Sequence, residues 1–130
     1  MTRGAASLTG LWHGLYSYPA QLRPVFFVAT LISHGAGFSG RTEEATVGTA
    51  GAPLALGAAL AGRAEGGTVD FTKTYEGAWR HAVLYAGRLS ADHTEIEGAW
   101  TIPGVWSGRF LMRRGERADE VELRRAWEEA

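Results

Sequence analysis

A few polar side chains interrupt the aromatic, alternating segments of this 130-residue sequence. They include a single lysine, Lys73, in a chain that has 12 arginines. An apolar wall with a small number of convergent polar groups is how ligand sites are usually built. We therefore expect a ligand site that contains Tyr16, Tyr18, Glu44, Lys73, Tyr75, His81, Tyr85 and Trp100.

Each of these residue types has its own chemistry and its own structural alternative. Lys73 is expected to pair with a ligand carboxylate or with Glu44, or to form a Schiff base if desolvation lowers its pKa; the alternative is a solvated lysine at a rim. Glu44 is alternatively a surface residue. His81 is a general acid or base, or a hydrogen-bonded structural residue. The tyrosine hydroxyls would hold a carbonyl or carboxylate, or pack in the core with a satisfied hydroxyl.

Several kinds of chemistry are excluded. The sequence has no cysteine, which rules out disulfides, thiol catalysis and cysteine-type metal sites. Its four histidines lack metal-ligand spacing, and no phosphate-binding glycine loop or Gly-x-Ser-x-Gly motif occurs. Glu43 and Glu44 are adjacent and point to opposite faces of a strand, so they are not a catalytic pair. We predict no metal and no cofactor.

Charge and hydropathy narrow the partners. A net charge of −1 argues against nucleic-acid binding. No apolar run is long enough to span a bilayer, and the first nine residues do not resemble a signal peptide. The expectation is a cytoplasmic protein that binds a small molecule, with no nucleic-acid or membrane partner.

The elements that must position these side chains are strands. Eighteen glycines and 14 aromatic residues suit short strands joined by tight turns. Segment 54–64 is rich in Ala and Leu and is either a short helix or a strand, and Gly57 and Gly62 favour the strand. The predicted strands are 10–18, 25–33, 38–47, 54–64, 68–75, 79–89, 94–102 and 105–113.

Eight sequential strands predict an all-β fold in one domain, 1–130. An open sheet would leave two exposed edges, whereas closure removes them, so we expect an eight-stranded antiparallel up-and-down β-barrel over about 10–114. Glycines inside the strands would relieve crowding as the barrel closes. Residues 116–130 are charged and predict a short C-terminal α-helix packed outside the barrel, or alternatively a frayed tail.

Alternation in each strand predicts which side chains face the lumen. These inward positions are Trp12, Gly14, Tyr16, Tyr18, Phe27, Ala29, Leu31, Phe38, Glu44, Val69, Phe71, Lys73, Tyr75, His81, Val83, Tyr85, Trp100, Trp106, Phe110 and Met112. Phe26, Val28 and Ile32 are expected to face outward.

Two motifs resemble the calycin superfamily of lipocalins, fatty-acid-binding proteins and avidins. Gly10-Leu11-Trp12 opens the first strand, and the last strand ends in basic residues. In lipocalins this tryptophan plugs the barrel floor under an arginine, so the resemblance implies that Trp12 is a plug covered by Arg113 or by the adjacent Arg114. Segment 68–113 is also similar to the second half of an avidin barrel, although the residue set that holds biotin has no full counterpart.

Three functions fit these observations. The first is a barrel that binds a small, partly apolar ligand with a carboxylate or carbonyl group. The second is a small barrel enzyme of the cyclase or isomerase type that uses lumen Tyr, Lys or His to polarise a carbonyl. The third is a filled barrel that acts through its outer surface as a protein-interaction or homo-oligomeric module.

Overall fold

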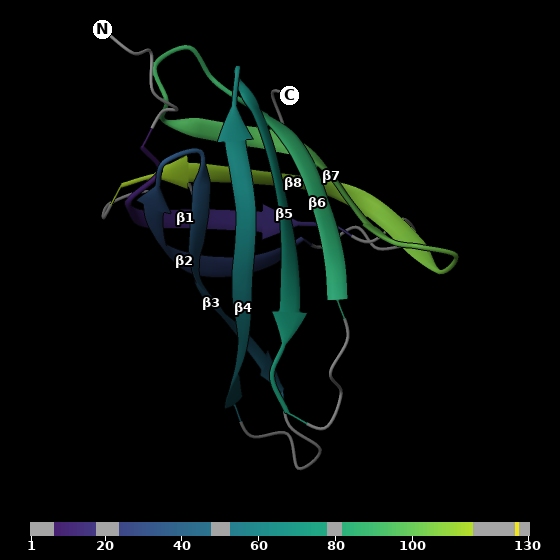
Figure 1. Cartoon of the computed structure of the whole chain (residues 1–130). Coiled ribbons are helices and arrows are strands. Elements are labelled where there is room, and N and C mark those ends of the chain that lie inside the picture. The colour runs from purple at the N-terminus through teal and green to yellow at the C-terminus, as the bar shows by residue number, and fades with distance from the viewer. Residues whose placement is uncertain (1–6, 18–23, 48–52, 78–81, 116–126, 128–130) are drawn as a thin grey trace, which may run out of the picture.

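A computed structural model of the chain describes residues 7–17, 24–47, 53–77, 82–115 and 127, with only the backbone described for 45–47 and 53–55. Its elements are eight strands (Figure 1). They are β1 (Gly10–Tyr16), β2 (Val25–His34), β3 (Gly37–Val47), β4 (Pro53–Glu65), β5 (Thr68–Tyr75), β6 (Ala82–Leu89), β7 (Glu95–Ile102) and β8 (Trp106–Arg114).

The strands form a closed antiparallel barrel in sequence order, and β1 pairs with both β2 and β8. In Figure 1, β4, β5 and β6 run steeply across β1 and β8. Strong coiling of this kind brings backbones close together at glycine. Gly87 and Gly98 are register partners, and a Cβ on Gly98 would meet the carbonyl oxygen of Ala86. The predicted closed barrel with glycine-relieved strands is therefore confirmed.

Segment 54–64 is strand, as its glycines favoured. The following hairpin turns at Gly66 and Gly67, whose φ angles of 62° and 83° suit glycine best. The helix predicted over 116–130 lies outside the described residues apart from Trp127. The described part of the chain contains no helix with the length and apolar character needed to cross a bilayer.

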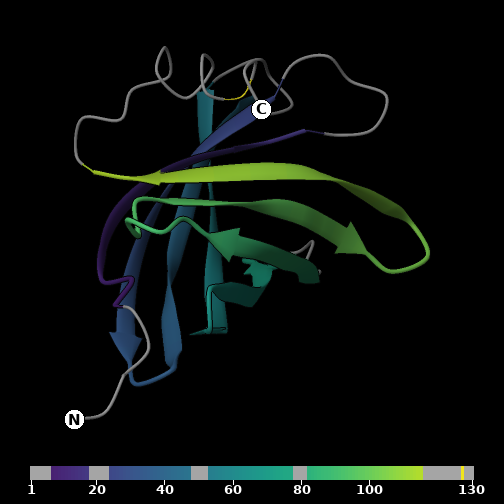
Figure 2. The same ribbon diagram turned by 90° about the horizontal axis from the view of Figure 1, so that it is seen from above.

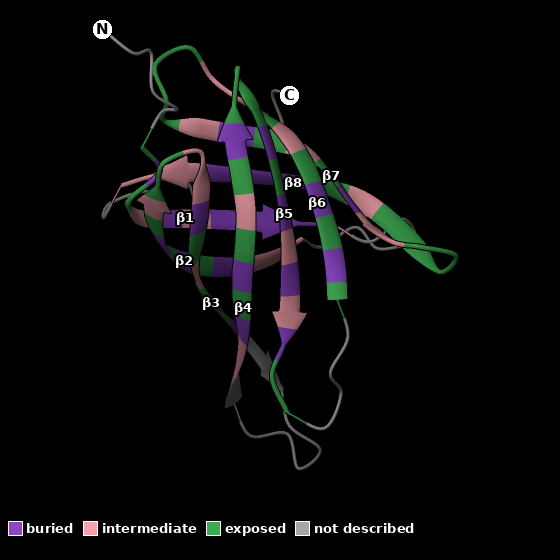
Figure 3. Cartoon of the chain, viewed as in Figure 1, coloured by how far each residue is buried: buried purple, intermediate pink, exposed green. Residues whose placement is uncertain are grey.

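Burial alternates along the strands (Figure 3). The buried set of side chains forms the core of the barrel. Except for Trp106, every predicted inward residue that the structure describes is buried. Tyr18 and His81 lie outside the described residues. Val28 and Ile32 are exposed on the outer face of β2, as predicted.

Trp106 is a correction, because its side chain is 54% exposed. Trp106 lies on the same face of β8 as Phe110, but it is nearer the end of the strand that projects from the barrel. β1 pairs with β8 only between Phe110 and Arg114, so at Trp106 the strand has β7 alone as a neighbour. The β7–β8 hairpin extends past the rest of the barrel there (Figure 2). Inward parity therefore does not bury this side chain.

One end of the barrel is plugged by Trp12. Its ring is fully buried, and its indole N–H donates to the carbonyl of Leu8 at 2.9 Å. The Arg114 guanidinium lies 4.7 Å from the ring centroid and donates to the carbonyl oxygens of Ser7, Thr9 and His93. These contacts seal what we call the plugged end.

The cover over Trp12 is thus Arg114 and not Arg113. Neighbouring residues of a strand face opposite sides, and Met112 is inward, so Arg114 is inward and Arg113 is outward. Arg113 instead lies 3.9 Å from the carboxylate of Glu95 on the outer surface.

A smaller apolar cluster lies outside the barrel. Leu15 and Leu111 are buried although they face outward, because Phe26 and Trp127 pack against them. The Arg109 guanidinium lies 4.4 Å from the centroid of the Trp127 ring. Trp127, the one described residue of the C-terminal segment, therefore covers the outer face of β1 and β8.

Candidate functional site

Polar side chains from four strands meet inside the barrel at the end opposite the plug. Tyr16 is the last residue of β1, Glu44 lies in β3, Lys73 and Tyr75 lie at the end of β5, and Tyr85 lies in β6. Strand alternation turns all five inward, and closure brings strands that are distant in sequence within hydrogen-bond reach. We call this end, where β1 and β5 finish, the polar end.

Glu44 is the centre of the cluster. Its carboxylate accepts hydrogen bonds from the Tyr16 hydroxyl at 2.7 Å and from the Tyr75 hydroxyl at 3.2 Å. The Lys73 ammonium donates to the second carboxylate oxygen at 3.0 Å. Glu44 is 6% exposed, so neither the surface alternative nor bulk solvation applies to it. Three donors of two chemical kinds therefore hold a buried carboxylate.

Lys73 lies in an aromatic cage. Its Nζ is 4.9 Å from the ring centroid of Tyr16, 5.0 Å from that of Phe27, 4.7 Å from that of Tyr75 and 5.7 Å from that of Tyr85. It also donates to the Tyr85 hydroxyl at 3.5 Å. Ring faces attract a cation, most strongly where water is excluded. Lys73 is 1% exposed, so the alternative of a solvated rim lysine is wrong.

Burial dominates the titration of Lys73. Desolvation lowers the pKa of its ammonium, while the charge and hydrogen bond of Glu44 act in the opposite direction. Burial likewise raises the pKa of the Tyr16 hydroxyl, with Tyr75 and Glu44 adding to the effect. Tyr16 is thus a neutral donor to Glu44 at neutral pH.

The pKa of Lys73 gives a direct test of this balance. Because Glu44 raises that pKa, Glu44→Gln is expected to lower it further below the ordinary value of 10.5. With lysine as the only labelled residue type, one ¹³Cε NMR signal reports the midpoint. Glu43→Gln, on the outer face of the same strand, is the control and should leave the midpoint unchanged. An unchanged midpoint in Glu44→Gln would contradict the pairing.

The lowered pKa of Lys73 also determines how the free energy of unfolding changes with pH. The unfolded chain binds more protons than the folded chain between the lowered pKa and 10.5. In that window the contribution of Lys73 makes the free energy of unfolding rise with pH.

Six of the eight predicted site residues are described, and the structure brings all six together. The sixth, Trp100, contacts Tyr16 edge-on with ring centroids 6.1 Å apart. Its indole N–H donates to the Ser17 carbonyl at 2.9 Å, so this ring supports the cluster and anchors the chain after β1. Tyr18 and His81 lie outside the described residues and keep the status of predictions.

Thr42 is a lumen residue that sequence reasoning missed. It is 1% exposed, two positions before Glu44 on the same face of β3, and its register partners are Ala29 and Ala58. Within the described part of the chain, its hydroxyl has no hydrogen-bond partner. A buried hydroxyl without a partner costs about 1–3 kcal/mol. The period-2 alternation that placed Glu44 inward would also have identified Thr42.

Thr42→Val is therefore expected to stabilise the ligand-free protein by about 1 kcal/mol, because it removes a polar group and keeps the shape of the side chain. Urea unfolding followed by tryptophan fluorescence measures this change. Thr30→Val, at an exposed position of β2, is the matched control and should change stability by less than about 0.5 kcal/mol. A loss of stability in Thr42→Val would show that the hydroxyl is already satisfied.

The two ends of the barrel differ in how they meet solvent. At the polar end Val25, Leu56 and Ile102 face inward by strand alternation, pack against the core and are only partly buried. Val25 is the register partner of Tyr16, and Leu56 is that of Glu44. The polar cluster thus lies beneath an apolar rim, whereas Trp12 and Arg114 seal the other end.

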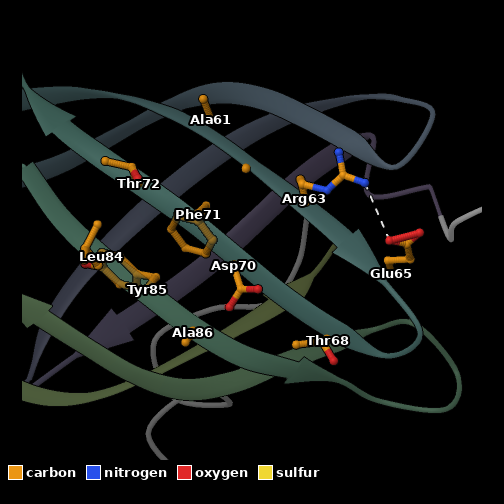
Figure 4. Close-up of a pocket in the computed structure, with 11 residues that line it drawn as sticks. Ala61, Arg63, Glu65, Thr68, Asp70, Phe71, Thr72, Leu84, Tyr85 and Ala86 are labelled. Carbon is orange, nitrogen blue, oxygen red and sulfur yellow. Dashed lines mark ion pairs between the residues drawn. The ribbon is translucent and has the colours of Figure 1, made fainter.

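A separate groove lies on the outer face of β4, β5 and β6 (Figure 4). Arg63, Thr68 and Asp70 line it with side chains that point away from the lumen, and Arg63 forms an exposed ion pair with Glu65 at 3.5 Å. Phe71 and Tyr85 also line the groove, and the Tyr85 hydroxyl lies 3.5 Å from Lys73 Nζ inside the barrel. Among the described residues, no cluster of His, Asp or Glu could hold a metal ion.

Comparison with known protein families finds no matching family model, and no curated protein matches the sequence. Fold and site therefore define the class of protein by themselves: a closed eight-stranded antiparallel β-barrel with a buried Glu–Lys–Tyr cluster at one end.

Proposed function

We propose that this chain is a calycin-like barrel that binds a small, partly apolar ligand bearing a carbonyl or carboxylate group. The observation that carries the proposal is the Glu44–Lys73 pair, which is buried among aromatic rings. A buried ion pair is often no more stabilising than well-packed apolar residues of the same volume. Stability alone is therefore a weak reason for its presence, and a ligand that uses these groups is a stronger one.

Further observations support the lumen as the site. The partly buried Val25, Leu56 and Ile102 place apolar surface beside the cluster at the polar end. The Thr42 hydroxyl offers a hydrogen bond on the same wall as Glu44. The plug of Trp12 under Arg114 has the arrangement that the calycin resemblance implies, and it supports that finer assignment of the barrel.

Mass spectrometry of the purified protein, native and then denatured, tests the proposal. The expected result is extra mass in the native spectrum that is released on denaturation and identifies the ligand. The variant Lys73→Met/Glu44→Gln, which removes both charges, should lose this mass. Arg63→Met, an exposed change on the outside of β4, should retain it.

A filled barrel that acts through its outer surface is the second candidate. The exposed Val28 and Ile32 on β2 favour it, because they leave apolar surface on the outside of the barrel. It predicts no extra mass, no effect of lumen substitutions on any interaction, and an oligomer in the native spectrum that Ile32→Lys disrupts. Ligand release together with a monomer would contradict it.

A further inference from the structure

The charge balance of the buried cluster narrows the class of ligand. Among the described residues, the buried charged side chains are Glu44 and Lys73. Lys73 and Glu44 already neutralise each other at 3.0 Å. A ligand carboxylate would add a second negative charge beside Glu44 with no further buried cation among these residues, and uncompensated buried charge is strongly disfavoured. A neutral carbonyl group adds no charge.

Lys73 also has the surroundings of a reactive amine. It is the only lysine of the chain, it is almost fully buried, and its Nζ touches a carboxylate that can take its proton. Desolvated lysines in apolar pockets are the ones that form Schiff bases, because the neutral amine is the nucleophile. The hydroxyl of Tyr85 also lies 3.5 Å from Nζ.

We propose that Lys73 captures an apolar aldehyde or ketone covalently, as an iminium ion held in the aromatic cage opposite Glu44. This inference rests on the proposed function and deepens it, because it selects the carbonyl from the two ligand classes. The carbonyl compound enters past the rim of Val25, Leu56 and Ile102.

The steps balance with Glu44 as the only proton carrier. The Lys73 ammonium passes a proton to the Glu44 carboxylate, and the neutral amine attacks the carbonyl carbon. The carbonyl π electrons move to oxygen, which takes the proton back from Glu44. The nitrogen then gives a second proton to Glu44, and the hydroxyl leaves with that proton as water while the C=N bond forms.

The product has the same charges as the starting pair. An iminium cation replaces the ammonium cation, and Glu44 is again a carboxylate. The four rings that lie 4.7–5.7 Å from Nζ attract either cation. The cage therefore suits the covalent product as well as it suits free lysine.

Three probes of one shape test the inference: 2-naphthaldehyde, 2-naphthylmethanol and 2-naphthoate. The protein is incubated with the aldehyde and sodium cyanoborohydride at pH 7, and peptide mapping locates the reduced adduct. Labelling of Lys73 is expected to be at least tenfold faster than labelling of the α-amino group in the same sample. It should fall at least tenfold in Glu44→Gln, which keeps the lysine, and in urea-unfolded protein. Lys73→Arg, which keeps the charge, should give no adduct at this position.

Reversible binding separates the inference from the proposed function. Fluorescence titration should show that the alcohol binds more tightly than the carboxylate. Binding of the alcohol with no adduct at Lys73 would overturn the covalent capture and leave the binding function in place. Tighter binding of 2-naphthoate would overturn the selection of a neutral carbonyl. If none of the three probes binds and no ligand is released from the native protein, both proposals are wrong.

Discussion

Lys73→Met alone is expected to lower the free energy of unfolding by about 3–5 kcal/mol, because it leaves the Glu44 carboxylate buried without its cation. The Tyr16 and Tyr75 hydroxyls remain as donors, but they supply no charge. Chemical denaturation at pH 7, followed by the fluorescence of the five tryptophans, measures the loss. Arg63→Met removes one arginine of an exposed ion pair and should change stability by less than about 1 kcal/mol.

The double variant Lys73→Met/Glu44→Gln should recover most of this loss. It removes both charges, and the glutamine oxygen still accepts hydrogen bonds from the two tyrosines. We expect it to lie within about 1 kcal/mol of the natural chain, since a buried ion pair and a neutral replacement of similar volume are often close in stability. A single variant that loses less than about 1 kcal/mol would mean that Lys73 reaches solvent and that Glu44 is not left alone.

Trp12→Ala is expected to cost about 3–5 kcal/mol, the range for removing a large aromatic ring from a core. The change would open a cavity at the plugged end and leave the Arg114 guanidinium without the ring below it. Its indole hydrogen bond to Leu8 is lost as well. The same denaturation experiment measures the effect.

Trp106→Ala is the matched control for the plug. Sequence alternation gave both tryptophans an inward direction, but Trp106 is more than half exposed on the projecting hairpin. Its replacement should cost less than about 1 kcal/mol. Equal losses in the two variants would contradict the difference in burial between the barrel end and the hairpin.

The barrel and most of its lumen could be predicted from local patterns. Alternation along each strand has a strict period of two, so one correct parity assigns a whole strand, as for Val69, Phe71, Lys73 and Tyr75 in β5. Turn glycines such as Gly66 and Gly67 mark where each strand ends. The sheet is then expected to close into a barrel, because an open eight-stranded sheet would leave two edge strands each with one unpaired side.

Alternation along a strand is not sufficient to assign every residue. Trp106 has the correct parity but lies where β8 has passed its β1 partner, and only the register of closure reveals that. The resemblance left the cover over Trp12 to Arg113 or Arg114, and the inward position of Met112 assigns it to Arg114. Alternation places Thr42 on the same face of β3 as Glu44, but only the register shows that its cross-strand neighbours are Ala29 and Ala58, which offer its hydroxyl no side-chain partner.

The sequence by itself determined the strands and most of their lumen faces, including those of Glu44, Lys73 and Tyr75, because alternation depends on neighbours along the chain. Tertiary structure alone decided what those residues do to one another. Glu44 and Lys73 are 29 positions apart, and Tyr16 and Glu44 are 28 apart. Only strand register and closure decide whether such groups meet, and at 3.0 Å a lumen lysine becomes one member of a buried ion pair.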